Sequence, residues 1–480
     1  MAKLSHLQPQ DVFGYFEQIT QIPRGSGNMD KITSFCLDFA EKHGLSAYRD
    51  KANNVVIKKP ASKGYEDADT VILQGHLDIV CQKTEDSDID FTKDGLDILV
   101  DSEYIYANGT TLGADNGIAV AMIMAILADK KLSHPSLEAV FTTDEEIGMI
   151  GALALDMSRL NGKRMINIDS EDSEIVTVSC AGGSDLRAEI PIQRKKRIGK
   201  SVTLTIKGLK GGHSGVEINS GRMNANVLMG RILRYLSNVC RFDIACIDGG
   251  DKGNAIPVMS RVVLISDDAD MLLAEIDIYA KQLQNEIKSL EPGFFWETEL
   301  SCEQEFDVME TDTAKNVIRT LTLAPNGVME MSAEIENLVE TSLNMGILKT
   351  DTNAVCILFT LRSNKQSGLE FLEERLTEFF EAMDCKTQTG GHYPPWEYKN
   401  DSVMRQVYIE KYKEKTGKDV RVEAIHAGLE CGVFASAISG LDCISIGPDM
   451  YGIHTVEERL NIISTREIYE IVCSMLADLK

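Results

Sequence analysis

Apolar strand-like runs alternate with helix-like segments in residues 1–186, and this pattern most limits what the chain can fold into. VILQGHLDIV (71–80), LEAVFTTDEE (137–146) and RMINIDSED (164–172) are apolar first and end in acidic residues or histidine. Between them, GIAVAMIMAILADKK (117–131) has the length and composition of a buried helix. Such alternation predicts a mostly parallel α/β sheet with helices on both faces. Ligands of these sheets bind at the carboxyl ends of the strands, where the polar residues fall.

The pattern changes near residue 187, which indicates an inserted domain. A basic cluster, IPIQRKKRIGK, precedes SVTLTIKGLKG, which alternates as a half-exposed antiparallel strand does. A helix-like stretch follows at about 216–238. A similar order of strands and helices then recurs, so we expect an α+β lid over 187–397 with two successive halves, about 187–292 and 293–397. The α/β pattern returns at 398–480, so residues 1–186 and 398–480 would form one catalytic domain interrupted by the lid.

The charge and cysteine content exclude some classes of function. The chain has 49 Lys and Arg against 74 Asp and Glu, a net charge of −25. Nucleic acids and anionic membranes need clustered positive charge, so we expect neither as a partner. No apolar stretch approaches the length of a membrane span, and MAKLSHLQPQDVFGYF lacks the apolar core of a signal peptide. Eleven scattered cysteines then read as reduced thiols of a cytoplasmic protein.

Histidine and acidic residues gather at the predicted strand ends. His76 and Asp78 share one face of a strand, because residues i and i+2 point the same way. Acidic residues stand at the other ends and before the apolar helix: Asp115, Glu145, Glu146 and Asp169. Each alone has an ordinary explanation, as a structural histidine or a solvated loop acid. Together they would repel one another unless divalent cations bound them, and mixed imidazole and carboxylate ligands suit zinc, cobalt or manganese.

A second imidazole is needed if two cations bind. His454, in the Gly-rich loop GPDMYGIHTVEERL of the returning α/β segment, can reach the strand ends. His213 lies in KGGHSG within the inserted domain. For His134 and His426 a packed or surface position is the simpler interpretation.

The motifs QGHLDIV, TLGADNG, TTDEEIG, INIDSED, KGGHSG and YGIHTVEERL occur together in this order. As a set they resemble the cocatalytic di-zinc peptidase family of aminoacylases, carboxypeptidases, tripeptidases and carnosinases. Essentially the whole chain is covered, and the long lid and HAGLECG (426–432) are most similar to the aminoacyl-histidine dipeptidase branch. The resemblance implies hydrolysis of dipeptides, Xaa-His and more broadly Xaa-Xaa with a free C-terminus.

The resemblance also implies a ligand set for two metal ions. His76 and Asp169 would hold one metal, and Glu146 and His454 the other. Asp115 would bridge both, with a water or hydroxide as the second bridge. Zn²⁺ is the expected metal, although Co²⁺ or Mn²⁺ would accept the same ligands. A cis peptide between Asp115 and Asn116 is part of the family pattern.

Catalytic and substrate-binding roles follow from the same resemblance. Asp78 would orient the metal-ligating His76, a common duty of an acid behind a ligand. Glu145 would be the general base, which requires the turn at 144–147 to leave strand geometry. His213 would stabilise the oxyanion, in its own chain or across a subunit interface. The expected substrate-binding residues are Arg362, Asn254 and Glu430.

Three alternatives stay open at the level of sequence. An N-acyl-amino-acid deacylase or an aminopeptidase would use the same ligands on the same scaffold. A catalytically silent binding protein would keep the fold, although the base, the bridge and both histidines are all present. The expected partner is a small peptide substrate, and a homodimer remains open.

Overall fold

The computed structural model describes residues 3–480, which form two units. The first unit comprises residues up to Ser179 together with Tyr398–Ala424 and Leu429–Lys480. The second comprises Cys180–Glu397 and Ile425–Gly428. The chain therefore leaves the first unit after Ser179 to build most of the second, returns at Tyr398, and enters the second unit again briefly at Ile425–Gly428. Among the described residues, no helix has both the length and the apolar composition that a membrane crossing requires.

The first unit is a mixed α/β structure around an eight-stranded sheet of order β1-β2-β6-β3-β7-β20-β8-β19. Its strands are β1 (Ser46–Arg49), β2 (Val55–Lys59), β3 (Val71–His76), β6 (Leu137–Thr142), β7 (Arg164–Asn167), β8 (Ile175–Cys180), β19 (Arg421–Ile425) and β20 (Asp442–Ser445). A small sheet adds β4 (Ile98–Val100), β5 (Tyr104–Ala107), β21 (Met450–Tyr451) and β22 (Arg459–Asn461). The central strands β6, β3, β7 and β20 are parallel.

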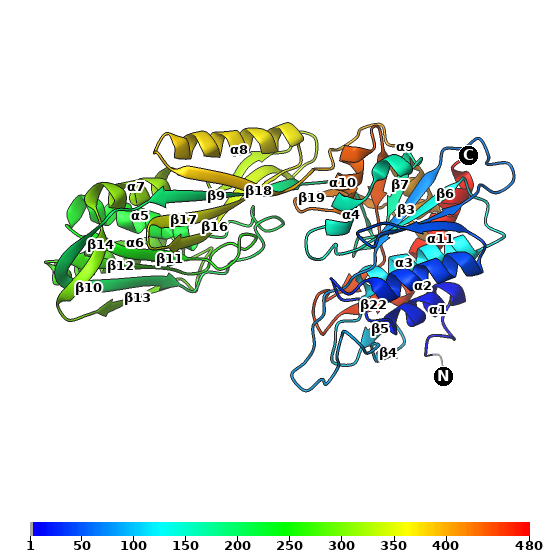
Figure 1. Cartoon of the computed structure of the whole chain (residues 1–480), viewed down its shortest axis with the longest axis horizontal. Helices are drawn as coiled ribbons and strands as arrows, with labels where there is room; N and C mark the ends of the chain where they lie inside the picture. The colour runs from blue at the N-terminus through cyan, green and yellow to red at the C-terminus, as the bar shows by residue number, and fades with distance from the viewer. Residues whose placement is uncertain (1–2) are drawn as a thin grey trace. The chain divides into compact units, whose positions relative to one another are not determined.

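Helices cover this sheet, as Figure 1 shows. They are α1 (Gln10–Thr20), α2 (Asp30–Lys42), α3 (Ala114–Ala128), α4 (Ile150–Ala154), the 3₁₀ turn η1 (Met157–Arg159), α9 (Val403–Thr416), α10 (Glu430–Ala437) and α11 (Ile462–Asp478). The main core joins α1, α2, α3, α9 and α11 to alternate strand residues such as Val71 and Leu73 of β3. The other face of β3 points toward α10, where Gln74 hydrogen-bonds Glu430. Helix α3 is apolar on nearly every side because all of its residues from Gly117 to Leu127 are buried.

The second unit is an α+β structure built on one ten-stranded sheet. Its strands are β9 (Gly182–Pro191), β10 (Arg194–Lys207), β11 (Asp243–Gly249), β12 (Ser260–Ser266), β13 (Phe295–Leu300), β14 (Gln304–Met309), β15 (Gly327–Met331), β16 (Val339–Thr350), β17 (Ala354–Ser363) and β18 (Lys386–Tyr393). Its helices are α5 (Ala225–Val239), α6 (Ala269–Ile287), α7 (Thr311–Leu323) and α8 (Gln366–Glu381). All four helices contribute to one core with alternate strand residues.

The fold class expected from the sequence is confirmed: an α/β unit interrupted by a large α+β unit. The sheet of the first unit is mixed, because its central strands β6, β3, β7 and β20 are parallel while β1, β2 and β8 join it in antiparallel pairs. The strands of both expected lid halves lie in a single sheet and pair with one another in several places, β10 with β13 and β14, β11 with β16, and β9 with β17 and β18.

Candidate metal centre and active site

Parallel register brings the polar strand ends of the first unit to one edge of its sheet. His76, the last residue of β3, is paired with Thr142 at the end of β6, and Gln74 with Asn167 at the end of β7. The residues that follow β6 and β7 include Glu145, Glu146 and Asp169. Because parallel strands end at the same edge, these side chains meet beside His76.

Asp115 lies at the centre of two groups of candidate metal ligands. Its Oδ1 is 3.0 Å from Nε2 of His76, and its Oδ2 is 3.2 Å from Nε2 of His454. Asp169 completes the first group, with Oδ1 3.5 Å from His76 Nε2. Glu146 completes the second, with Oε2 3.0 Å from His454 Nε2. One carboxylate thus faces an imidazole on each side, as a ligand shared by two cations must.

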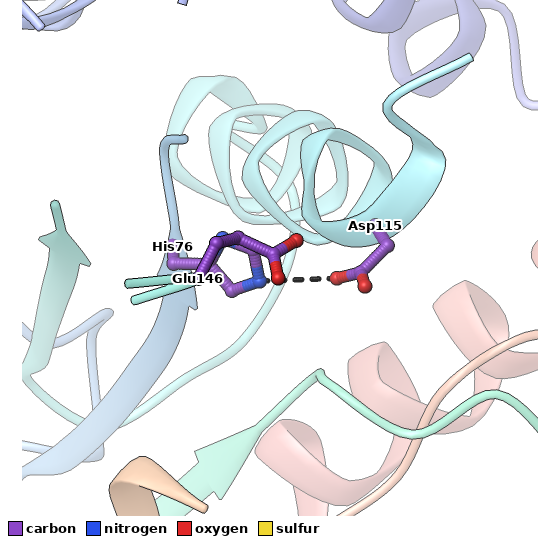
Figure 2. A group of neighbouring side chains, drawn as sticks. All are labelled: His76, Asp115 and Glu146. Atoms are coloured by element: carbon purple, nitrogen blue, oxygen red, sulfur yellow. Dashed lines mark hydrogen bonds and ion pairs between the residues drawn. The ribbon is translucent and has the colours of Figure 1, made fainter. Parts of the chain in front are cut away.

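Figure 2 shows three of these side chains: His76 from the end of β3, Asp115 from the start of α3, and Glu146 from the turn after β6. One ligand atom from each lies within 4.8 Å of the others. Two imidazoles and three carboxylates are donors that zinc, cobalt and manganese accept. Three carboxylates, from Asp115, Glu146 and Asp169, crowd around the two imidazoles, so the donor set fits two divalent cations.

Asp78 holds the turn that carries Glu145 and Glu146. Its Oδ1 accepts the backbone N–H of Glu145 at 3.0 Å, and its Oδ2 accepts that of Glu146 at 3.2 Å. Ser26 Oγ donates to the same carboxylate at 2.8 Å, and His76 Nδ1 lies 3.5 Å from it. The turn departs from strand geometry as expected, because β6 ends at Thr142 and Asp144 has a φ of 54°. Asp78 therefore positions both glutamates and the ring of His76.

Two buried charged residues that the sequence did not single out support the Asp115 loop. Glu458 is 3% exposed and accepts backbone N–H groups from four consecutive residues, Leu112 to Asp115, at 2.7 to 3.3 Å. Arg24 is 1% exposed and donates to the carbonyls of Leu77 and Gly113. Little in the sequence marks these two residues as part of the site. Glu458 stands four residues after His454, and Arg24 is isolated from the motifs. The expected cis peptide between Asp115 and Asn116 is present in this loop.

Electrostatics at the cluster favour bound cations. Burial opposes protonation of His76, but the carboxylates of Asp169, Asp115 and Asp78 raise its pKa well above the usual value. Hydrogen bonds to Asp115 and Glu146 raise the pKa of His454 to about 10. Without metal, protonated His76 and His454 thus balance part of the negative charge of the carboxylates. Divalent cations would displace these protons, since a ligating imidazole must be neutral.

Two glutamates beside the ligands are also shifted. Burial raises the pKa of Glu145 well above its ordinary value, with Asp169, Glu430 and Glu146 adding to the shift. Burial likewise raises the pKa of Glu430 to about 7. Glu430 is fully buried, where its Oε2 accepts from Gln74 at 2.5 Å and Thr142 at 2.7 Å. Its Oε1 has no hydrogen-bond partner among the described residues.

The remaining expected residues lie in the second unit. Arg362 on β17 is 7% exposed and donates from Nη1 to Tyr393 Oη at 2.7 Å, while its Nε has no partner among the described residues. Nδ1 of His213 accepts the backbone N–H groups of Gly215 and Val216, both at 3.2 Å. The neutral ring therefore carries its proton on Nε2, and burial together with Arg362 lowers the His213 pKa. The Asn254 residue is exposed, and its carbonyl accepts the N–H of Ser214.

His426 and His134 have structural partners, in line with the simpler interpretation. His426 is buried in the second unit, with Nε2 2.7 Å from Ser342 Oγ and Nδ1 3.0 Å from Asn364 Oδ1. Burial lowers its pKa to about 3, so the ring is neutral. His134 is buried in the first unit, with Nδ1 2.7 Å from the carbonyl of Pro135.

Comparison with known proteins defines the class to which this fold and site belong. The model of peptidase family M20/M25/M40 matches residues 72–478, so the chain belongs to that family. Among individual relatives, the cytosol non-specific dipeptidase of Escherichia coli is 35% identical over 100% of this chain and 99% of its own length. The crystal structure of aminoacylhistidine dipeptidase from Vibrio alginolyticus, also 35% identical, superposes with a TM-score of 0.91 over 99% of this chain and 98% of that one.

A more distant structure shares the fold alone. Human carnosine dipeptidase 1 is 12% identical and has a TM-score of 0.52 over 98% of this chain and 95% of its own. The family resemblance read from the motifs is confirmed by these comparisons, as is the dipeptidase branch of the family.

Proposed function

We propose that this chain is a metal-dependent dipeptidase that cleaves Xaa-His and other Xaa-Xaa dipeptides with a free C-terminus. The observation that carries the proposal is the pair of ligand groups around Asp115, each with its own imidazole, in a chain of a peptidase family. The full-length likeness to two proteins named as dipeptidases supports the substrate class.

His76 and Asp169 would hold one cation, Glu146 and His454 the other, and Asp115 both. Zn²⁺ is the expected metal, and Co²⁺ or Mn²⁺ fit the same donors. When bound, such ions polarise a carbonyl and lower the pKa of water.

Glu145 is the proposed general base. The Asp78 carboxylate accepts the backbone N–H of Glu145 and so holds it beside the proposed ligand Glu146. In the proposal, the Glu145 carboxylate does not itself bind a metal ion. It would take a proton from the attacking water as the new C–O bond forms. It would then deliver that proton to the leaving amine nitrogen as the C–N bond breaks, giving a free carboxylic acid and a free amine.

Arg362 is the proposed site for the C-terminal carboxylate of the substrate. A buried guanidinium is costly without an anionic partner, and among the described residues the Arg362 side chain donates a hydrogen bond to the neutral Tyr393 hydroxyl and forms no ion pair. A guanidinium binds a carboxylate through two parallel hydrogen bonds. His213, whose Nε2 carries the proton, would donate to the developing oxyanion, and Asn254 and Glu430 stay in the proposal as substrate-binding residues.

The substrate requirement separates this proposal from its rivals. A free carboxylate matters for a dipeptidase and for an N-acyl-amino-acid deacylase, but an aminopeptidase would accept amidated peptides. A panel of carnosine, Ala-His, Ala-His amide and N-acetyl-histidine distinguishes the three activities. Hydrolysis of none of them by protein carrying two metal ions would support the silent binding protein. A cytoplasmic location stays a prediction, and whether the chain forms a homodimer stays open.

The test of mechanism is Glu145→Gln, with Glu41→Gln on the exposed surface of α2 as the matched control. Loss of the base should lower kcat by at least ~100-fold, because general base catalysis contributes 10²–10⁴-fold. Metal content, measured by elemental analysis, should stay near two per chain in both variants. Activity within tenfold of wild type in Glu145→Gln, with metals retained, would remove Glu145 from the mechanism.

A further inference from the structure

A pocket of about 770 Å³ opens on the second unit and is lined mainly by basic and apolar side chains. Its walls come from the C-terminal end of α5, the start of β11, helix α7, strand β10 and Asp267 after β12. Helices α5 and α7 pack against each other along one wall. The volume lies within the 300–1,000 Å³ typical of small-molecule sites.

Positive charge in this pocket is not balanced by its own acids. The basic lining residues are Arg197, Arg234, Arg241, Lys315 and Arg319. Arg197 pairs with both acidic lining residues, Asp267 at 2.6 Å and Asp243 at 3.3 Å. Lys315 pairs with Asp312 at 3.1 Å, which leaves the three other arginines. The surplus is notable in a chain with a net charge of −25, where a carboxylate partner is easily supplied.

Three of the arginines make no ion pair within the described chain. Arg234 reaches only Ser237 Oγ at 3.5 Å, and Arg319 reaches only Asn316 Oδ1 at 3.4 Å. Arg241 forms no ion pair among residues 3–480. Positive charges placed around one concavity repel one another, and an anion bound between them would offset this repulsion by its attraction to each.

The rest of the lining indicates more than a simple ion. Phe242, Ala314, Ile318 and Leu323 supply apolar surface, and Leu323 is 64% exposed. Planar guanidinium groups bind phosphate oxygens through paired hydrogen bonds, and an aromatic ring offers a stacking face to a heterocycle. The pocket therefore suits an anion with several charges and a flat or apolar body.

We propose that this pocket binds an organic polyphosphate of nucleotide size, with the phosphates on Arg234, Arg241 and Arg319 and the heterocycle against Phe242 and Ile318. The site belongs wholly to the second unit and is separate from the metal centre in the first. It is a binding site additional to the proposed peptidase activity and does not depend on it.

The test is calorimetric titration of the full-length protein with adenosine triphosphate, inorganic tripolyphosphate and adenosine, with Mg²⁺ in excess so that other cations are not stripped. Adenosine triphosphate should bind most tightly, tripolyphosphate several-fold more weakly, and adenosine only weakly. The triple variant Arg234→Ala/Arg241→Ala/Arg319→Ala should weaken adenosine triphosphate binding by tenfold or more. Affinity should also fall as salt rises.

Arg261→Ala is the matched control, because Arg261 is an exposed arginine at the opposite end of β12 from Asp267 and does not line the pocket. It should bind as wild type does. The single variant Arg241→Lys, which keeps the charge but loses the planar fork, should bind more weakly than wild type and more tightly than the triple variant.

Three outcomes would overturn the proposal. They are no binding of any phosphate at millimolar concentration, equal binding by the wild type and the triple variant, and binding of an acidic peptide or a second copy of the chain in place of the nucleotide. Unchanged melting temperatures of the variants establish that any loss of binding is local.

Discussion

At the scale of single residues, the site depends on buried or half-buried carboxylates that have different roles. Asp115 faces both imidazoles, Asp78 binds the backbone of the adjacent turn, and Glu458 binds the backbone that carries Asp115. Only the first would touch a metal ion. The other two are buried acceptors of N–H groups, which places the ligands before any ion binds.

Glu458→Ala should disturb the metal centre through the backbone. Four buried N–H groups would lose their acceptor, and each such loss costs roughly 1–3 kcal/mol before relaxation. We expect the free energy of unfolding to fall by about 3 kcal/mol or more and the affinity for Zn²⁺ to fall by at least about tenfold. Chemical denaturation and zinc titration against a chromophoric chelator measure the two effects.

Glu457→Ala is the control, because Glu457 is the exposed neighbour of Glu458 and should tolerate the change. Glu458→Gln should resemble Glu458→Ala, since an amide offers one acceptor oxygen and turns its NH₂ toward donors. Wild-type zinc affinity in Glu458→Ala would show that the Asp115 loop holds its geometry unaided.

At the scale of elements, the close approach of α3 to β3 sets the position of Asp115. A Cβ at Gly75 would lie 2.4 Å from Asn116 Oδ1 and 3.0 Å from the Ala119 side chain. Asn116 itself bridges the elements, because its Oδ1 accepts the N–H of His76 and its amide donates to the Ile168 carbonyl. The start of α3 is thus fixed to the end of β3 by one side chain packed over a glycine.

Gly75→Ala should push the two elements apart. Overpacking of a tight interface costs typically 1–3 kcal/mol, and here it would also displace Asp115 from the imidazoles. We expect a lower melting temperature and weaker metal binding, measured by calorimetry and zinc titration.

Gly14→Ala in α1 is the opposite case, because nothing lies within 4 Å of its added Cβ. Alanine is the better helix former by about 1 kcal/mol, so this variant should keep or raise stability. If Gly75→Ala behaved like Gly14→Ala, the contact with Asn116 would not control the site.

The elements also show where sequence reasoning misplaced a boundary. The apolar pattern predicted a helix over about 216–238, whereas α5 begins at Ala225. Asn224 caps it, with its side chain accepting the N–H groups of Asn226 and Val227. The preceding residues form turns, so periodicity placed the start of the helix too early, ahead of the N-cap residue at which it begins.

At the scale of the whole molecule, the metal-free protein should lose stability as pH rises. The folded-state pKa values of His454, about 10, and Glu430, about 7, lie above their ordinary values of 6.5 and 4.5. Groups of raised pKa stabilise the fold below the unfolded value, and this contribution is lost as pH rises through the folded value. The window is therefore about pH 4.5–7 for Glu430 and about pH 6.5–10 for His454.

Urea unfolding of chelator-treated protein at pH 6.5 and 9 measures this effect. The free energy of unfolding should be lower at pH 9, and saturating Zn²⁺ should remove the difference, because bound cations replace the protons. A metal-free protein that gained stability at pH 9 would contradict the assignment of His454 to the carboxylate cluster.

The sequence by itself determined the mixed α/β class, the insertion and the identities of the polar strand ends. Apolar runs followed by acids or histidine are local patterns, and parallel strands bring their carboxyl ends together whatever the loops do. The family resemblance in the ordered motifs added roles to His76, Asp115, Glu145, Glu146, Asp169 and His454. The motifs and apolar runs are each contained in a short stretch of sequence, so they can be recognised without the fold.

Only the tertiary structure decided which residues support that site. Arg24, Asn116 and Glu458 act through contacts with backbone groups tens or hundreds of positions away, and no local pattern marks such partners. The arginine pocket likewise combines α5, β10 and α7, which are far apart in sequence. The physical reason is the same in both cases. Which buried polar and charged groups bond to one another depends on which residues the fold brings together, and the order of residues along the chain does not show this.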